Sequence, residues 1–232
     1  RKRSSAASDV YKRQQQGDKV AIAGSNTAHW IMADLASTMA GAAAVGLYPK
    51  MSGEHINYIL EHSEAKLIFL GPMIDAETVD KSIPEGMPRI RLPYKSVTIH
   101  ADHEWDDLVA ANEPIADYKA PSDDEIWAMI YTSGTTGAPK GVMISGKNVR
   151  TSVSGLLEVL GEAEDERWFS YLPLAHIFER GIVELASLYQ GAQVNFLESQ
   201  EKFAEQLKEV APTRFIGVPL IWSRIQSKVM EQ

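Results

Sequence analysis

The 232 residues carry 23 basic and 31 acidic side chains, and the net charge of −8 gives a nucleic-acid partner no electrostatic support. Cysteine is absent, which excludes disulfides, thiolate nucleophiles and Cys-ligated metals and fits a reducing compartment such as the cytoplasm. The 44% apolar and 23% charged content is that of a globular protein with one large core or two small ones.

The N-terminal segment is predicted to lie outside the fold. Residues 1–16 (RKRSSAASDVYKRQQQ) are polar, lack apolar periodicity and contain no hydrophobic region of a secretory signal. We therefore expect a non-native or disordered arm there. The longest weakly polar stretch, 31–48, is mostly alanine and glycine and carries Asp34, so we expect no transmembrane segment.

From Gly17 onward, short apolar runs alternate with amphipathic segments of helix length. This alternation predicts the α/β class, with parallel-rich sheets layered with helices. Strands are expected at 20–23, 43–47, 67–70, 126–131, 142–144, 168–171, 193–196 and 214–218. Helices are expected at 28–39, 53–62, 148–160, 177–189, 201–210 and 220–230, with Ser52 and Ser199 as N-caps.

Residues 113–125 indicate a surface connector, because they hold Pro114, Pro121 and an acidic run but few large apolar residues. The connector divides the chain into a first α/β segment at 17–112 and a second at 126–232. The apolar pattern of the last predicted helix stops at Gln232 without a cap or tail. We therefore expect the second segment to be truncated and the chain to be a fragment.

The most informative segment is 131–141 (YTSGTTGAPKG), a polar loop between two apolar runs. Glycines can turn backbone N–H groups around an anion, and hydroxyls and a lysine add donors and charge. We therefore predict phosphate binding rather than an ordinary glycine-rich hairpin. Residues 141–148 come close to a Walker A loop, but Asn148 replaces its Ser/Thr and the middle is apolar and strand-like.

The segment 132–141 resembles the signature loop of the adenylate-forming superfamily, which includes acyl-CoA synthetases, luciferases and peptide-synthetase adenylation domains. Residues 171–180 (YLPLAHIFER) resemble the second core motif of its long-chain fatty acyl-CoA synthetases, and 211–222 the third. The likeness runs from Gly17 to Gln232. It implies part of the large N-terminal, AMP-binding domain, with the C-terminal portion and its later motifs absent.

His176 also stands out without the resemblance. It follows a predicted strand and begins a predicted helix, so it would lie at the carboxyl end of a parallel strand, where open α/β sheets bind ligands. A histidine donor there could meet a carboxylate or an acyl-phosphate oxygen. The alternative is a helix-capping or packed histidine.

The resemblance implies a long-chain fatty acid–CoA ligase that uses ATP, Mg²⁺ and coenzyme A. Lys140 and His176 would be the catalytic residues, with His176 and Phe178 facing the acyl or adenylate pocket. Thr132 would bind the metal. The nucleotide phosphates would be bound by Thr132, Ser133, Gly134, Thr135, Thr136, Gly137 and Lys140. Long-chain substrates partition into lipid, so peripheral contact of a cytoplasmic protein with the inner membrane face stays open.

Two departures from the family pattern are visible. Residues 145–148 (SGKN) stand where the family commonly has Thr-His-x-Asn, and the place of an aromatic gate to the acyl tunnel offers Phe178 and Arg180. The second departure leaves the choice of acyl chain open.

Three other functions stay open. The chain could belong to an enzyme that adenylates a medium-chain, aryl or amino acid, to a Walker-type NTPase, or to a non-catalytic fragment that binds nucleotide or acyl groups. A metal cluster at 100–104 (HADHE) is disfavoured, since His103 and Glu104 begin an amphipathic pattern with Trp105.

Overall fold

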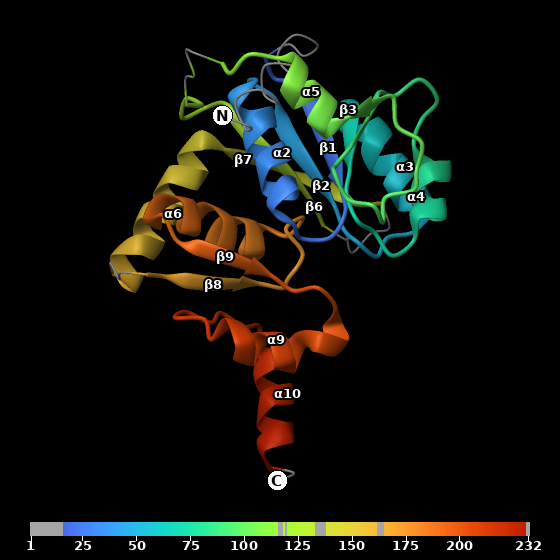
Figure 1. Cartoon of the computed structure of the whole chain (residues 1–232). Coiled ribbons are helices and arrows are strands. Elements are labelled where there is room, and N and C mark those ends of the chain that lie inside the picture. Colours follow the sequence, from blue (N-terminus) through green and yellow to red (C-terminus); the bar gives the residue numbers. More distant parts are fainter. Residues whose placement is uncertain (1–15, 116–117, 119, 133–137, 162–164, 231–232) are drawn as a thin grey trace.

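The computed structural model describes residues 16–115, 118, 120–132, 138–161 and 165–230. Its main element is a seven-stranded sheet in the order β5-β4-β3-β1-β2-β6-β7 (Figure 1). All neighbouring strands are parallel except β6 and β7, which are antiparallel. The strands are β1 (Lys19–Ala23), β2 (Ala43–Leu47), β3 (Ala65–Leu70), β4 (Arg89–Arg91), β5 (His103–Glu104), β6 (Ile126–Thr132) and β7 (Lys140–Ser145).

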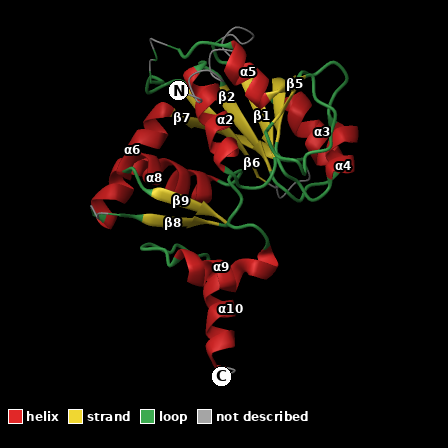
Figure 2. Ribbon diagram, in the orientation of Figure 1, coloured by secondary structure: helices red, strands yellow, loops and turns green. Residues whose placement is uncertain are grey.

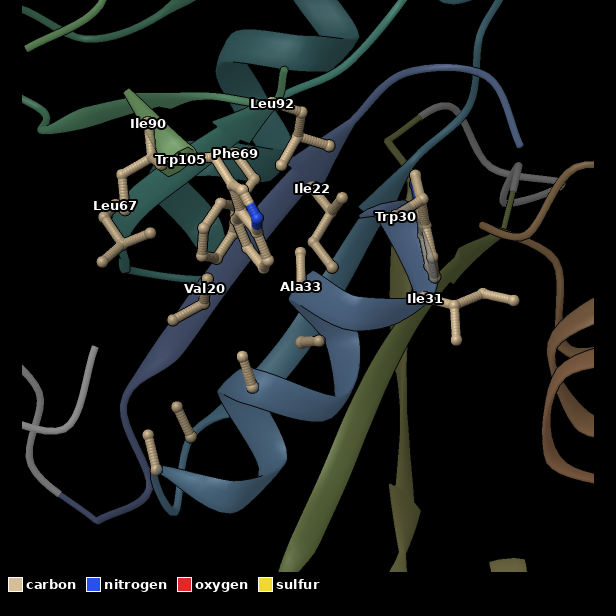
Figure 3. Close-up of a cluster of buried hydrophobic side chains, with 14 of the residues drawn as sticks. Val20, Ile22, Trp30, Ile31, Ala33, Leu67, Phe69, Ile90, Leu92 and Trp105 are labelled. Carbon is tan, nitrogen blue, oxygen red and sulfur yellow. The ribbon is translucent and has the colours of Figure 1, made fainter. Parts of the chain in front are cut away.

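Both faces of this sheet are buried, because successive side chains of a strand point to opposite faces. Val20 and Ile22 of β1 pack in one cluster with Trp30 of α2 (Ala28–Met39) and Trp105 of α5 (Trp105–Ala111), as Figure 3 shows. Ala21 and Ala23 pack on the other face with α3 (Gly53–His62) and α4 (Ala76–Ser82). The result is a helix–sheet–helix sandwich, and the predicted α/β class is confirmed.

A second, two-stranded parallel sheet follows. It pairs β8 (Arg167–Ser170) with β9 (Gln193–Phe196). One face packs on α6 (Gly146–Leu160) and on a helical run of α7 (Ile177–Glu179), the π-helix η1 (Arg180–Ala186) and α8 (Ser187–Gln190). Figures 1 and 2 show the remaining helices beyond β8. They are α9 (Phe203–Val210), which follows the short η2 (Gln200–Lys202), and α10 (Pro219–Met230).

Aromatic rings join this second sheet to α9 and α10. Tyr171 lies 5.2 Å from Phe203 and 5.5 Å from Phe215, between ring centroids. Phe215 in turn meets Trp222 of α10 edge-on at 5.4 Å. Such ring pairs add to the stability that burial itself provides.

Most predicted elements exist, with bounds shifted by a few residues. The strand predicted at 214–218 is wrong, since only Arg214 makes an isolated bridge, to Trp168. The helix predicted at 177–189 is interrupted by η1. Ser52 caps α3 as predicted, accepting from the His55 N–H, but Ser199 makes no side-chain cap bond. The sheet takes strands from both sides of 113–125, so the division of the chain there stays a prediction.

No helix among the described residues is long and apolar enough to cross a membrane.

Candidate active site

Three loops meet at one edge of the large sheet. β1, β2 and β6 run parallel, so their carboxyl ends lie at the same edge. The register pairs Val45 with Met129, which places Tyr48 and Thr132, each three residues further on, at that edge together. Asn26 follows the carboxyl end of β1 there. This carboxyl edge is the place where open α/β sheets bind ligands.

The predicted phosphate loop leaves the sheet at this edge. Thr132 ends β6, Lys140 begins β7, and the two residues are partners in the antiparallel pairing. Both are exposed, so a hydroxyl and an ammonium group stand together at the base of the loop. Such a donor pair fits a phosphate, and the hydroxyl oxygen fits Mg²⁺. The predicted ligands Ser133, Gly134, Thr135, Thr136 and Gly137 lie outside the described residues.

The base of this hairpin is fixed by Tyr131. Its ring is buried and its hydroxyl lies 2.8 Å from Nδ1 of His62 at the end of α3. Burial raises the pKa of the Tyr131 phenol to about 12, so it stays neutral at physiological pH. A Cβ at Gly141 would lie 3.0 Å from the same ring, which explains why glycine stands opposite. No pattern around His62, the last residue of α3, indicates this partner in the sequence.

The segment 171–176 packs against the end of β2. A Cβ on Gly46 would come within 2.8 Å of the Ala175 Cα, so the two backbones are in close contact. The exposed ring of His176 follows, edge-on to Tyr48 with 6.4 Å between ring centroids. The sequence-predicted residues Thr132, Lys140 and His176 therefore belong to elements that meet at the carboxyl edge.

His176 is also the N-cap of α7. Its Nδ1 accepts a hydrogen bond from the backbone N–H of Phe178 at 3.1 Å. In the neutral ring this contact assigns the proton to Nε2, which makes that atom a donor. Capping and ligand binding are compatible, because they use different nitrogens. Phe178 itself is half-buried.

Glu179, one residue after Phe178, is buried behind this segment. Its Oε1 accepts from the Ser170 hydroxyl at 2.7 Å and from the Tyr171 N–H at 3.0 Å. Burial raises the pKa of its carboxyl to about 7. Sequence reasoning missed this residue, because no local pattern around Glu179 indicates that its carboxyl is buried.

Arg180, which the sequence offers near the expected aromatic gate, has a fully buried side chain that pairs with Asp34 of α2. Its guanidinium lies 4.3 Å from the ring centroid of Trp127 and 5.4 Å from that of Trp30. Glu184 is buried as well, and burial together with the nearby Asp34 raises the pKa of its carboxyl well above its usual range. A buried ion pair thus connects α2 with η1.

The acidic residues at 102 and 104 contact two arginines. Within the described part of the chain, no three His, Cys, Asp or Glu side chains are grouped to hold a metal ion. Asp102 accepts from the Arg89 N–H at 2.9 Å, and Glu104 pairs with Arg91 through two contacts of 3.0 Å. That pairing lowers the pKa of Glu104.

The Walker-like segment has the wrong secondary structure for a phosphate loop. Its first five residues, 141–145, form the greater part of β7. Ser145 and Asn148 then close a capping box at the start of α6, so Asn148 has a structural partner in place of a metal.

Comparison with known structures defines the class of this domain. The chain superimposes on o-succinylbenzoate CoA synthetase (MenE) from Bacillus subtilis, solved with ATP and magnesium ion, with a TM-score of 0.74 and 23% identity over 97% of this chain and 44% of that one. VinN gives a TM-score of 0.78 at 18% identity, covering 100% and 56%. The fold is that of the N-terminal domain of adenylate-forming enzymes.

The sequence comparisons define the family. The model for "AMP-binding enzyme" matches residues 6–232, and the chain belongs to this family. It is 30% identical over 234 residues to long chain acyl-CoA synthetase 4 of Arabidopsis thaliana, covering 92% of this chain and 35% of the relative. It is 31% identical over 228 residues to the long-chain-fatty-acid–CoA ligase ACSBG2 of Xenopus laevis, covering 90% and 31%. The chain thus spans about a third of the length of these curated relatives.

Proposed function

We propose that this chain is part of an ATP-dependent long-chain fatty acid–CoA ligase and carries its phosphate-binding loop. In the first half-reaction the fatty carboxylate attacks the α-phosphorus of ATP, giving acyl-adenylate and pyrophosphate. In the second, the thiol of coenzyme A attacks the acyl carbon and AMP leaves. The observation that carries the proposal is the meeting of Thr132, Lys140 and His176 on elements that share the carboxyl edge of the sheet.

Each residue has a role that its chemistry allows. Lys140 and the loop hydroxyls would bind the β- and γ-phosphates and hold the departing pyrophosphate. Thr132 would supply one oxygen to Mg²⁺, which, when bound, neutralises phosphate charge. His176 would donate from Nε2 to a carboxylate or acyl-phosphate oxygen, with Phe178 beside it on the acyl side.

The acid is proposed to be a long-chain fatty acid. Support comes from the form of the motif at 171–180 and from the two long-chain relatives at 30% and 31% identity. Medium-chain, aryl and amino acids are the competing substrates. The cytoplasmic location and peripheral contact with the inner membrane face stay predictions.

The test is pyrophosphate release by a full-length synthetase that contains this chain, supplied with ATP, Mg²⁺ and carboxylic acids from acetate to oleate. We expect release to rise with chain length and AMP to be the nucleotide product. If pyrophosphate release were highest with a short-chain, aryl or amino acid, that acid would define the substrate class in place of long-chain fatty acids. Formation of ADP in place of AMP would reject adenylation altogether and favour the NTPase alternative.

The 232 residues by themselves have a second candidate role, as a non-catalytic binding fragment. The observation that favours it is their coverage of about a third of the curated relatives. We expect at most weak nucleotide binding by the isolated chain in calorimetry and no acyl-CoA formation. Thioester formation by the isolated chain would place all the catalytic groups within these residues.

A further inference from the structure

Asn26 connects the loop after β1 to the segment that leads to His176. Its Nδ2 donates to the Ser170 hydroxyl at 2.8 Å and to the Leu172 carbonyl at 2.6 Å. Its Oδ1 accepts from the Leu174 N–H at 3.0 Å. Both amide hydrogens and the amide oxygen are therefore used on residues 144 to 148 positions away.

The connection continues to Glu179, the last residue of α7. Ser170, which accepts from Asn26, donates its own hydroxyl to Glu179, and Glu179 also accepts from the Tyr171 N–H. Ser170, Leu172 and Leu174 are thus each held by a hydrogen bond to the Asn26 amide. Ala175 has little freedom either, because it lies against Gly46.

His176 comes two residues after Leu174 and is the last residue before α7. Its ring orientation depends on two things, the path of the backbone through 172–175 and the capping bond from the Phe178 N–H. The capping bond can form only when the segment turns into α7 at the right place. Asn26 holds that path from the carboxyl edge of the large sheet. The predicted phosphate loop connects β6 and β7 at the same edge.

We propose that Asn26 is a positioning residue, which holds the segment 170–174 so that His176 keeps its Nε2–H directed to the ligand. The inference rests on the proposed function only in taking His176 as the residue that meets the acid or acyl-phosphate. Without Asn26, the Leu172 carbonyl and the Leu174 N–H lose their partner in a half-buried place, and the segment shifts to find others.

The kinetic test is a double-mutant cycle in the full-length synthetase. We expect Asn26→Ala to lower kcat/KM for the acid about tenfold in the wild-type background, the scale of losing one or two buried hydrogen bonds. In a His176→Ala background the same change should cost less than about twofold, because a positioning residue acts through its target. An equal loss in both backgrounds would overturn the proposal and leave Asn26 a residue of stability alone.

A matched control is Asn57→Ala. Asn57 is a half-buried asparagine on α3 whose amide donates to the Ser82 carbonyl at 3.3 Å. Its removal should leave kcat/KM within about twofold of wild type. If Asn26→Ala does not fold, Asn26→Asp carries the same cycle, since it keeps the acceptor for the Leu174 N–H and loses both donors.

A second readout does not need activity. In the isolated 232-residue chain, nitrogen-15 NMR of the His176 ring, assigned by comparison with His176→Ala, should show one neutral tautomer with Nδ1 unprotonated. In Asn26→Ala the two tautomers should average. An unchanged ring spectrum would contradict the proposal. A synthetase that released no pyrophosphate with any acid would reject the proposed function, and the NMR result would still decide on Asn26.

Discussion

At the scale of single residues, Lys140 and Thr136 carry the predicted contact with the nucleotide phosphates. A charge-assisted hydrogen bond is worth about 1.5–3 kcal/mol, and 1.4 kcal/mol is a factor of ten. The combined Thr136→Ala and Lys140→Ala change in a full-length synthetase should therefore lower kcat/KM for ATP at least tenfold. Steady-state pyrophosphate release at varied ATP measures it.

Lys147 supplies the control for this experiment. It is an exposed lysine in the first turn of α6, and it is the lysine that a Walker loop at 141–148 would use. Lys147→Ala should leave kcat/KM for ATP unchanged. If Lys147 were essential and the double variant kept wild-type activity, the phosphates would be bound by the Walker-like segment 141–148. The predicted role of the loop at 131–141 would then be rejected.

Glu179 predicts a pH dependence of stability. Its pKa in the folded chain is about 7 because of burial, against an ordinary value of 4.5. The folded state therefore holds a proton that the unfolded state has lost between these values, so the contribution of this group is complete below pH 4.5 and is lost as pH rises through 7. The shift corresponds to roughly 3 kcal/mol at most.

Urea unfolding of the 232-residue chain at pH values across this window measures the effect. The free energy of unfolding should fall as pH rises, and Glu179→Gln should make the fall shallower. Some slope should remain in the variant, since burial also raises the pKa of Glu184. An identical slope in wild type and variant would show that Glu179 is not the group that titrates.

At the scale of elements, the close approach of β2 to the segment 171–176 depends on Gly46. A Cβ there would lie 2.8 Å from the Ala175 Cα and 3.2 Å from the Trp30 ring, so backbone must move. Gly46→Ala should lower the free energy of unfolding by about 1–3 kcal/mol, the usual cost of overpacking. Urea unfolding of the isolated chain is the measurement.

Gly155 offers the opposite case in the same chain. It lies exposed within α6, and a Cβ added there would meet nothing within 4 Å. Gly155→Ala should stabilise by about 0.5–1 kcal/mol, because alanine loses less backbone entropy in a helix. A loss at Gly155, or no loss at Gly46, would contradict the packing described.

The elements also show how far sequence reasoning reaches. Strands such as Ala43–Leu47 were predictable because they are continuous apolar runs. α2 was predictable because its helical pattern extends over 12 residues. β4 and β5 were missed, since they have only three and two residues and carry charged side chains, and β5 also lies at the edge of the sheet. The π-helix was missed because its difference from an α-helix lies in the backbone hydrogen bonds, which run from i to i+5 and leave no mark in the residue types of a seven-residue segment.

The candidate site divides in the same way. The loop at 131–141 was predictable because its glycines, hydroxyls and lysine are contiguous and have one chemical use. Asn26 and Glu179 were not, because each acts through partners that only the fold brings near, in the case of Asn26 at least 144 residues away. A lone asparagine or glutamate has no local pattern that shows such a role.

At the scale of the whole molecule, the large sheet and the second sheet are joined across a buried surface. Asp34 of α2 meets Arg180 of η1 there, and Trp30 and Trp127 lie beside the guanidinium. Asn26 crosses the same boundary with its three hydrogen bonds. The relative placement of the two sheets, and with it the meeting of His176 and the phosphate loop, depends on these contacts.

The ion pair gives the most demanding prediction. Both side chains are fully buried, so removing one charge leaves the other without compensation or water. Asp34→Asn, which keeps the shape, should lower the free energy of unfolding of the 232-residue chain by about 3–5 kcal/mol at pH 7. Urea unfolding measures it, with the exposed Lys81–Glu77 pair as a reference, since Lys81→Ala should change stability by less than about 1 kcal/mol.

Glu184 sharpens this test because it is a second buried acid beside the same arginine. Burial and the nearby Asp34 raise the pKa of the Glu184 carboxyl, which favours its neutral form, so we expect Glu184→Gln to cost less than Asp34→Asn. A Glu184→Gln variant as unstable as Asp34→Asn would mean that Glu184 carries the charge that balances Arg180. The contact between the two sheets would then depend on the Glu184 carboxylate and not on that of Asp34.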